Sequence, residues 1–271
     1  MLGLQLYTVR HKMTDRESIR DTLMKIKEMG YECVQLASSV EKMEIAANVC
    51  GEIGLSAVGL LCNIDMCETA GDKLFEIARI CGAKDIGISS SIKNEDEAEE
   101  LIRRSNAFAK KARASGFSFS YHNHSNEFIR GNNGKTLIEL LIEGFDSELV
   151  DFMPDTYWIQ HGGADVRAFL EILDGRVNIL HLKDMKRTPA GSTFAEIGVG
   201  NINFKGIAEV AERIGVEHYI VEQDACDTDS LISAAISYDY MINLTKENKN
   251  VQNRTGRNRC CSESAGNQSA F

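Results

Sequence analysis

Residues 2–12 read LGLQLYTVRHK, an apolar run followed by a more polar turn. The run Leu2–Tyr7 predicts a β-strand, and a segment with helical spacing begins soon after it. Similar strand-then-helix units recur along the chain, a pattern typical of either a closed barrel or an open doubly wound sheet. The open form often carries a glycine-rich turn after its first strand. Residues 8–12 contain no glycine, so this stretch favours a (β/α)8 TIM barrel of the α/β class.

Eight short apolar runs predict the strands of this barrel. They are Leu2–Tyr7, Tyr31–Ala37, Leu55–Cys62, Asp85–Ser89, Phe117–His124, Leu149–Asp155, Val177–Lys183 and Tyr219–Asp224. The first helix is expected to begin at a capping box formed by Thr14 and Glu17. Gly30 is expected to end that helix in a left-handed conformation. We expect residues 191–200, with two glycines near their end, to form a loop that either covers the substrate or is a plain connection.

The length of 271 residues suits a single domain, which we place at residues 1–245. From residue 246 the chain is polar and basic with almost no aliphatic residues. Such a segment cannot bury enough apolar area to offset its ordering entropy, so we expect a disordered polar tail over residues 246–271. The eight cysteines lie mostly in apolar patterns, and they are interpreted as reduced core thiols.

Composition also excludes several classes of protein. The formal net charge of −10 disfavours binding to the phosphate backbone of a nucleic acid. No stretch approaches the roughly 20 apolar residues of a membrane helix. The first residues read directly as a strand rather than as a secretory signal, so we expect a cytoplasmic protein.

Ionisable side chains gather at the ends of the last four predicted strands, where the active sites of such barrels lie. The candidate metal ligands, one for each strand, are His122 or Glu127, then Asp155, His181 and Glu222. Imidazoles and carboxylates together suit a divalent ion such as Mn²⁺, Mg²⁺, Co²⁺ or Zn²⁺. Because strand side chains alternate between faces, His124 shares a side with His122, and Lys183 shares one with His181.

Each of these residues also has a structural interpretation. Asp155 is placed to cap the following helix, His181 to be a buried hydrogen-bonded histidine, and Glu222 to be a salt-bridge partner. Their joint occurrence at successive strand ends makes a purely structural explanation poor, and the pattern therefore indicates a metal site.

Several segments resemble motifs of the sugar phosphate isomerase/epimerase family, also called the xylose isomerase-like barrels. In order, they are LGLQLYTVR, YHNHSNEF, DTYW with HGGADV, HLKD, EIGVGNINF and VEQD. The resemblance implies one divalent ion, usually Mn²⁺, bound by Asp155, His181 and Glu222 at the mouth of the barrel. Many members carry a glutamate where this chain has His122. Strand register favours His122 as the first ligand, with Glu127 as the alternative.

Another departure is Gln35 at the end of the second strand, where a glutamate is common in the family; this weakens any assignment of a base there. The resemblance implies a metal-dependent isomerase or epimerase that acts on a small sugar, keto-sugar or polyol through an enediolate. The groups expected to move protons or hold a substrate oxygen are Glu127, His124, Glu222 and Lys183. Substrate contacts are expected at Gln5, Tyr7 and Trp158, with a place in the core as the alternative for Trp158.

Three alternatives to this activity follow from the same residues. One is a dehydratase or lyase acting on a keto-inositol or 3-keto-glycoside, which shares the enediolate step. The second is a non-catalytic sugar-binding barrel, and the filled ligand positions weigh against it. The third, an abasic-site endonuclease, is disfavoured by the acidic charge and the mononuclear ligand pattern. Since family members often form dimers or tetramers, a homo-oligomer is one expected state.

Overall fold

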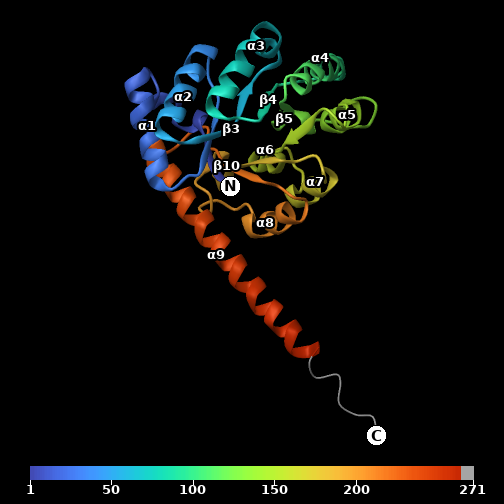
Figure 1. Cartoon of the computed structure of the whole chain (residues 1–271). Helices are drawn as coiled ribbons and strands as arrows, with labels where there is room; N and C mark the ends of the chain where they lie inside the picture. Colours follow the sequence, from blue (N-terminus) through green and yellow to red (C-terminus); the bar gives the residue numbers. More distant parts are fainter. Residues whose placement is uncertain (264–271) are drawn as a thin grey trace.

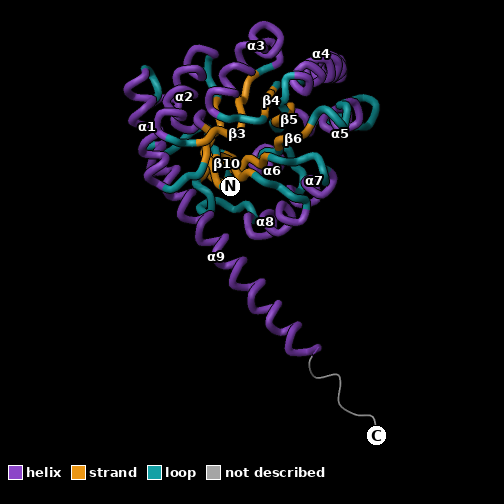
Figure 2. Tube along the Cα trace, in the orientation of Figure 1, coloured by secondary structure: helices purple, strands orange, loops and turns teal. Residues whose placement is uncertain are grey.

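A nearly closed barrel of eight parallel strands forms the centre of the molecule, with helices around it (Figures 1 and 2). A computed structural model describes the backbone of residues 1–263 and the side chains of residues 1–246. The strands follow the order β6-β5-β4-β3-β2-β1-β10-β7. The (β/α)8 TIM barrel predicted from the sequence is therefore confirmed.

The barrel strands are β1 (Leu2–Gln5), β2 (Cys33–Leu36), β3 (Ser56–Cys62), β4 (Asp85–Ser89), β5 (Ser118–His122), β6 (Asp151–Met153), β7 (Ile179–Leu182) and β10 (His218–Val221). The helices are α1 (Arg16–Met29), α2 (Val40–Ile53), α3 (Ile64–Cys81), α4 (Glu95–Ala114), α5 (Leu137–Gly144), α6 (Thr156–His161), α7 (Val166–Ile172), α8 (Phe204–Arg213) and α9 (Ser230–Glu263). Two 3₁₀ turns, η1 (Leu6–Lys12) and η2 (Asn126–Phe128), follow β1 and β5. Seven of the eight predicted strands contain the observed strand in full, and β10 begins one residue before the predicted Tyr219–Asp224.

The barrel closes between β6 and β7 through two isolated parallel bridges, which join Phe152 to Val177 and Asp155 to His181. The two bridges are three residues apart on the β6 side and four residues apart on the β7 side, so the pairing is irregular there. Two of the predicted metal ligands, Asp155 and His181, therefore lie directly across the closing seam from each other.

The first strand is shorter than predicted because Leu6 and Tyr7 belong to the turn η1. The side chain of Gln5 accepts a hydrogen bond from the backbone N–H of Tyr7, which ends the extended conformation. The predicted capping box is wrong by one residue. Asp15 is the N-cap of α1 and exchanges hydrogen bonds with Ser18. Gly30 ends α1 with φ of 103°, as predicted.

The predicted loop at residues 191–200 is wrong in part. Its first five residues form the strand β9 (Gly191–Ala195), which pairs with β8 (Asp184–Thr188) in an antiparallel hairpin. The remainder wraps around the buried carboxylate of Asp184. This carboxylate accepts hydrogen bonds from the backbone N–H groups of Met185, Gly198, Gly200 and Ile202. A Cβ on Gly200 would collide with this carboxylate, so the loop requires glycine at that position.

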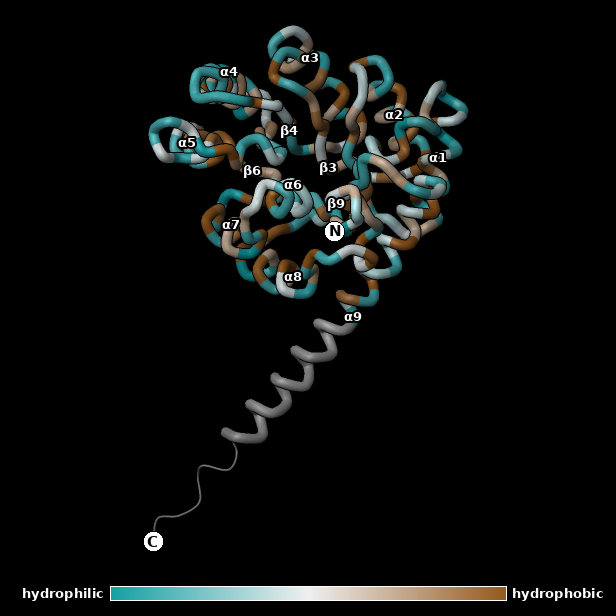
Figure 3. The backbone as a smooth tube through the Cα atoms, turned by 180° about the vertical axis from the view of Figure 1, so that it is seen from behind, coloured by the Kyte–Doolittle hydropathy of each residue, from teal (hydrophilic) through white to brown (hydrophobic). Residues whose placement is uncertain are grey.

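The outer helices carry both hydrophobic and hydrophilic stretches, as Figure 3 shows from behind. The start of α9 packs on the barrel through Leu231, Ala234, Met241 and Leu244. The backbone of α9 continues to Glu263, into the segment predicted as a polar tail. Residues 264–271 of that segment lie outside the described residues, and its disorder stays a prediction.

Five cysteines are buried and free, as expected of core thiols; they are Cys33, Cys50, Cys62, Cys67 and Cys81. The pKa values of several of these thiols are raised by burial, among them that of Cys33, to about 11. No helix in the described part of the chain has the length and apolar character needed to cross a membrane.

Candidate metal centre

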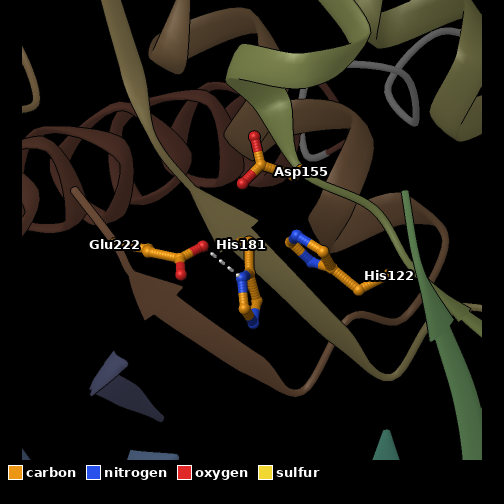
Figure 4. A group of neighbouring side chains, drawn as sticks. All are labelled: His122, Asp155, His181 and Glu222. Atoms are coloured by element: carbon orange, nitrogen blue, oxygen red, sulfur yellow. Dashed lines mark hydrogen bonds and ion pairs between the residues drawn. The ribbon is translucent and has the colours of Figure 1, made fainter. Parts of the chain in front are cut away.

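Four side chains converge where the strands of the second half of the barrel end (Figure 4). His122 ends β5, Asp155 follows β6, His181 lies in β7, and Glu222 directly follows β10. Each offers one ligand atom, and these atoms all lie within 4.8 Å of one another. All four side chains are buried, so water competes little for any cation that binds among them. The structure thus brings together the four predicted metal ligands.

Asp155 has both of the roles considered from the sequence. Its Oδ1 accepts a hydrogen bond of 3.0 Å from the backbone N–H of Trp158 and so caps α6. Its Oδ2 faces the ammonium of Lys183 at 3.0 Å. Burial raises the pKa of Asp155 to about 6, while the charge of Lys183 opposes that rise. One carboxylate oxygen therefore holds the helix, and the other faces the cluster.

Lys183 places a buried positive charge among three carboxylates. Its Nζ lies 2.9 Å from Glu222 Oε2 and 3.2 Å from Asp224 Oδ1, in addition to its contact with Asp155. Burial alone would lower the pKa of Lys183, but these carboxylates raise it, so the ammonium stays charged. Burial alone would likewise raise the pKa of Glu222, but Lys183 and His181 hold it well below its usual range.

The two imidazoles of the group differ in their hydrogen bonds. His181 uses both nitrogens, with Nδ1 at 2.9 Å from Glu222 Oε2 and Nε2 at 2.7 Å from Gln35 Oε1. His122 stands 4.6 Å from the His181 ring, measured between centroids. Burial, followed by the neighbouring His181, lowers the pKa of His122 well below its usual value. A neutral imidazole with a lone pair is the form that binds metals.

An unpaired nitrogen in the cluster fits a divalent ion. Among the residues whose side chains are described, His122 Nδ1 is buried without a hydrogen-bond partner, whereas Asp155 Oδ2 pairs with the Lys183 ammonium at 3.0 Å. Buried polar atoms normally have partners, and their absence calls for an explanation such as a bound ion. Two imidazoles and two carboxylates are a donor set used for divalent transition metals.

Glu127 points elsewhere. Its carboxylate accepts hydrogen bonds from the Tyr121 hydroxyl at 2.6 Å and from the backbone N–H of His124 at 3.0 Å. Burial raises the pKa of Glu127. Of the two candidates for the first ligand, the four-residue group contains His122 and not Glu127. The role of Glu127 in proton transfer stays a prediction.

The other predicted catalytic and substrate-binding residues lie at different depths. The ring of His124 is 5.2 Å from that of His122 and 5.3 Å from that of Trp158. The Lys183 ammonium also lies over the ring of Trp158, with Nζ 5.3 Å from the ring centroid. Gln5 is fully buried behind the cluster, whereas Tyr7 is 42% exposed. Trp158 and His124 therefore line the cluster, and Gln5 supports it from behind.

Sequence reasoning left three contributors without a role in the site. Gln35 is hydrogen-bonded to His181, and Asp224 forms an ion pair with Lys183. The ring centroid of Phe194, in β9, lies 5.9 Å from the Lys183 Nζ. The alternation of side chains along a strand points to Asp224, because it lies two residues beyond Glu222. Phe194 gave no such signal, since the hairpin that carries it was not foreseen.

The fold and the cluster together define a (β/α)8 barrel with a candidate metal centre at the carboxyl ends of its strands. A family model described as the xylose isomerase-like TIM barrel matches residues 23–238. The chain belongs to this family, as the resemblance in its motifs implied.

Solved structures with the same fold include several sugar-processing proteins. A sugar phosphate isomerase/epimerase from Parabacteroides distasonis is similar with a TM-score of 0.71 and 22% identity, over 88% of this chain and 92% of that one. A D-allulose 3-epimerase from Methylomonas sp. gives a TM-score of 0.68 and 11% identity, over 90% and 97%. A xylose isomerase-like barrel from Mycobacterium smegmatis, in complex with magnesium, gives 0.63 and 16%, over 86% and 90%. No curated protein sequence matches the chain significantly.

Proposed function

We propose that this protein is a divalent-metal-dependent isomerase or epimerase of a small sugar, keto-sugar or polyol. The observation that carries the proposal is the buried His122, Asp155, His181 and Glu222 cluster, with ligand atoms within 4.8 Å and an unpaired nitrogen on His122. Membership of the xylose isomerase-like family supports a small-molecule sugar substrate. The buried free thiols are compatible with work in the reducing cytoplasm.

These four residues would hold one ion, for which Mn²⁺ is our first choice and Mg²⁺, Co²⁺ or Zn²⁺ the alternatives. When bound, such an ion supplies Lewis-acid polarisation of a carbonyl and stabilises the charge of an enediolate. The burial of all four ligands excludes bulk water, which strengthens electrostatic interactions with a charged transition state.

We assign Lys183 the role of holding a substrate oxygen. Its ammonium is buried and is aimed between Asp155, Glu222 and Asp224. A fixed positive charge there stabilises negative charge that develops on an oxygen as a carbon-bound proton leaves. Because the three carboxylates hold the ammonium in place, little reorganisation is needed during the reaction.

His124 is the group we assign to proton transfer. Its Nδ1 is buried and has no partner among the described side chains, and its ring lies beside His122 and Trp158. An imidazole takes and returns a proton near neutral pH. Transfer to the neighbouring carbon gives isomerisation, and return to the opposite face of the same carbon gives epimerisation. Glu127 acts in this scheme as a positioning residue, through its hydrogen bond to the His124 backbone.

The aromatic rings of Trp158 and Phe194 form one wall beside Lys183, with their centroids 5.8 Å apart. Aromatic faces bind the C–H faces of sugars while excluding water. We assign this wall to substrate binding, together with Tyr7 in the turn η1.

The test is deuterium exchange in D₂O with Mn²⁺ and a panel of ketoses, keto-inositols and 3-keto-glycosides. We expect a carbon-bound deuterium to appear in an isomeric or epimeric product with the wild type. Exchange is expected to be lost in His122→Ala and retained in His11→Ala, a change of an exposed histidine outside the cluster.

Two other outcomes would replace the proposal. Exchange with loss of water, giving an unsaturated product, would identify a dehydratase or lyase. Saturable sugar binding without exchange of any substrate proton would identify a non-catalytic sugar-binding barrel.

A further inference from the structure

A buried row of hydrogen bonds runs behind the metal cluster, from the first turn of the chain to His181. The Tyr7 backbone N–H lies 3.3 Å from Gln5 Oε1, and Gln5 Nε2 lies 2.6 Å from Gln35 Oε1. Gln35 Oε1 in turn lies 2.7 Å from His181 Nε2. The side chains of Gln5, Gln35 and His181 are fully buried, so bulk water does not compete for these bonds.

The direction of every bond in this row follows from its first donor. A backbone N–H only donates, so the atom of Gln5 that faces Tyr7 must be the amide oxygen. The other atom of the Gln5 amide is then its nitrogen, which donates to Gln35. The atom of Gln35 that receives this bond must be an oxygen, because an amide nitrogen does not accept.

The orientation of Gln35 then fixes the proton on His181. Its oxygen accepts from His181 Nε2, so that nitrogen carries hydrogen. The Gln35 nitrogen is left to face the thioether of Met153 at 3.2 Å, a weak acceptor. In a neutral imidazole with hydrogen on Nε2, the lone pair lies on Nδ1. In Figure 4 Nδ1 faces Glu222, 2.9 Å from its Oε2, and the other ring nitrogen points away from Asp155. An ionised carboxylate only accepts, so Nδ1 also carries hydrogen without a metal ion, and a bound ion would displace that hydrogen and use the Nδ1 lone pair.

We infer that Gln5 and Gln35 are positioning residues that select the His181 tautomer with Nδ1 as the metal-binding nitrogen. The inference rests on the proposed metal centre and assigns a role to the neutral ends of the first two strands. Outer hydrogen-bond partners of this kind fix the tautomer and ring orientation of metal-binding histidines. The tautomer of a residue in β7 is thus set by a backbone N–H in the first 3₁₀ turn.

The experiment compares the wild type with Gln35→Met, Gln35→Glu and Gln5→Met. Methionine keeps the length of the side chain and removes the acceptor, whereas glutamate keeps an acceptor for both donors. Gln160→Met is the matched control, because Gln160 lies on α6 outside this row of bonds. The two readouts are the Zn²⁺ dissociation constant and the ¹H–¹⁵N spectrum of the histidine rings. Spectra are recorded with and without Zn²⁺ above about pH 8, where most histidines are neutral.

We expect a metal-bound Nδ1 and a protonated Nε2 for His181 in the wild type. Gln35→Met is expected to weaken Zn²⁺ binding by about 10–100-fold and to remove the single-tautomer signal. Gln35→Glu is expected to restore both, and Gln5→Met to weaken binding less, since Gln35 keeps its oxygen. The control should match the wild type.

Metal bound through Nε2 would overturn the inference, as would unchanged Zn²⁺ binding and spectra in folded Gln35→Met. If Gln35→Met does not fold, the decision falls to Gln35→Glu and Gln5→Met, and wild-type-like spectra and affinity in Gln5→Met would overturn the role of Gln5. If the wild type binds no Zn²⁺, the proposed function fails, and the metal-free spectrum still shows whether His181 Nε2 carries the hydrogen that Gln35 is inferred to hold there.

Discussion

The two halves of the barrel supply different chemistry to the same site. The strands of the second half end in charged or ionisable groups, namely His122, Asp155, His181, Lys183, Glu222 and Asp224. The strands of the first half end in neutral groups, namely Gln5, Gln35, Cys62 and Ser89. Gln5 and Gln35 still reach the site, through His181. One half thus provides the ligands, and the other provides hydrogen bonds that orient one of them.

This division depends on charge balance within the second half. Asp155, Glu222 and Asp224 surround one ammonium, that of Lys183. Without a metal ion, Lys183 is the cation that compensates them. A bound divalent ion would take over part of that compensation, which links stability to metal binding.

The largest expected effect comes from Lys183→Met. Removing the buried cation leaves three carboxylates uncompensated, and we expect a loss of about 3–5 kcal/mol in the free energy of unfolding without metal. Mn²⁺ should recover much of this loss, because the ion replaces the missing positive charge. Denaturant unfolding with and without Mn²⁺ measures both effects.

The matched control for that change is Lys186→Met, which removes a partly exposed ion pair with Asp227. Such surface pairs contribute roughly 0–1 kcal/mol. Equal destabilisation by the two substitutions would break the contrast between the charged cluster and the rest of the barrel mouth.

The second prediction concerns Asp85, a buried carboxylate where β4 begins, at the end of the barrel opposite to Asp155. Asp85 accepts hydrogen bonds from the hydroxyls of Ser118 and Ser120. Burial raises its pKa from 3.8 to about 6. The folded protein therefore binds the proton more tightly than the unfolded chain, so this contribution to stability is complete below about pH 4 and is lost as pH rises through about 6.

The expected loss is on the order of 3 kcal/mol between pH 4 and pH 7. Asp85→Asn should remove this part of the pH dependence, as measured by unfolding at several pH values, and should leave Mn²⁺ affinity unchanged. A parallel pH profile in wild type and variant would show that the Asp85 carboxyl does not titrate in this range.

A smaller effect is expected at Asp184, which supports the loop beside the site without joining the charged cluster. Asp184→Asn removes a charged acceptor shared by four backbone N–H groups. We expect a loss of about 1–3 kcal/mol and faster hydrogen exchange at Gly198 and Gly200. Asp227→Asn is the control, and equal exchange rates in the two variants would contradict the anchoring role of Asp184.

Much of the fold was predictable because each strand is a short apolar run with turn signals at its ends. The ligands were predictable for a related reason. An ionisable residue directly after a buried strand loses hydration, which costs free energy unless the residue is paired or binds a metal ion. The strand ends at His122, Asp155, His181 and Glu222 therefore gave a strong signal.

The neutral contributors gave a weaker signal. A glutamine such as Gln35 is common in proteins, and its role depends on partners that are 30 and 146 residues away along the chain. The hairpin β8–β9 was missed because its residues, such as Lys186 and Arg187, are polar and the hairpin packs outside the barrel sheet. The capping box shifted by one residue because Thr14, Asp15 and Ser18 all offer side-chain oxygens near the start of α1.

The most direct test of the account is the metal content and Mn²⁺ affinity of the purified protein. It compares wild type, His122→Ala and Glu222→Ala with the control variants His11→Ala and Glu28→Ala, which change exposed residues. We predict one ion per chain, lost in both cluster variants and retained in both controls. A wild type that binds no divalent ion and gains no thermal stability from Mn²⁺, Mg²⁺, Co²⁺ or Zn²⁺ would contradict the account.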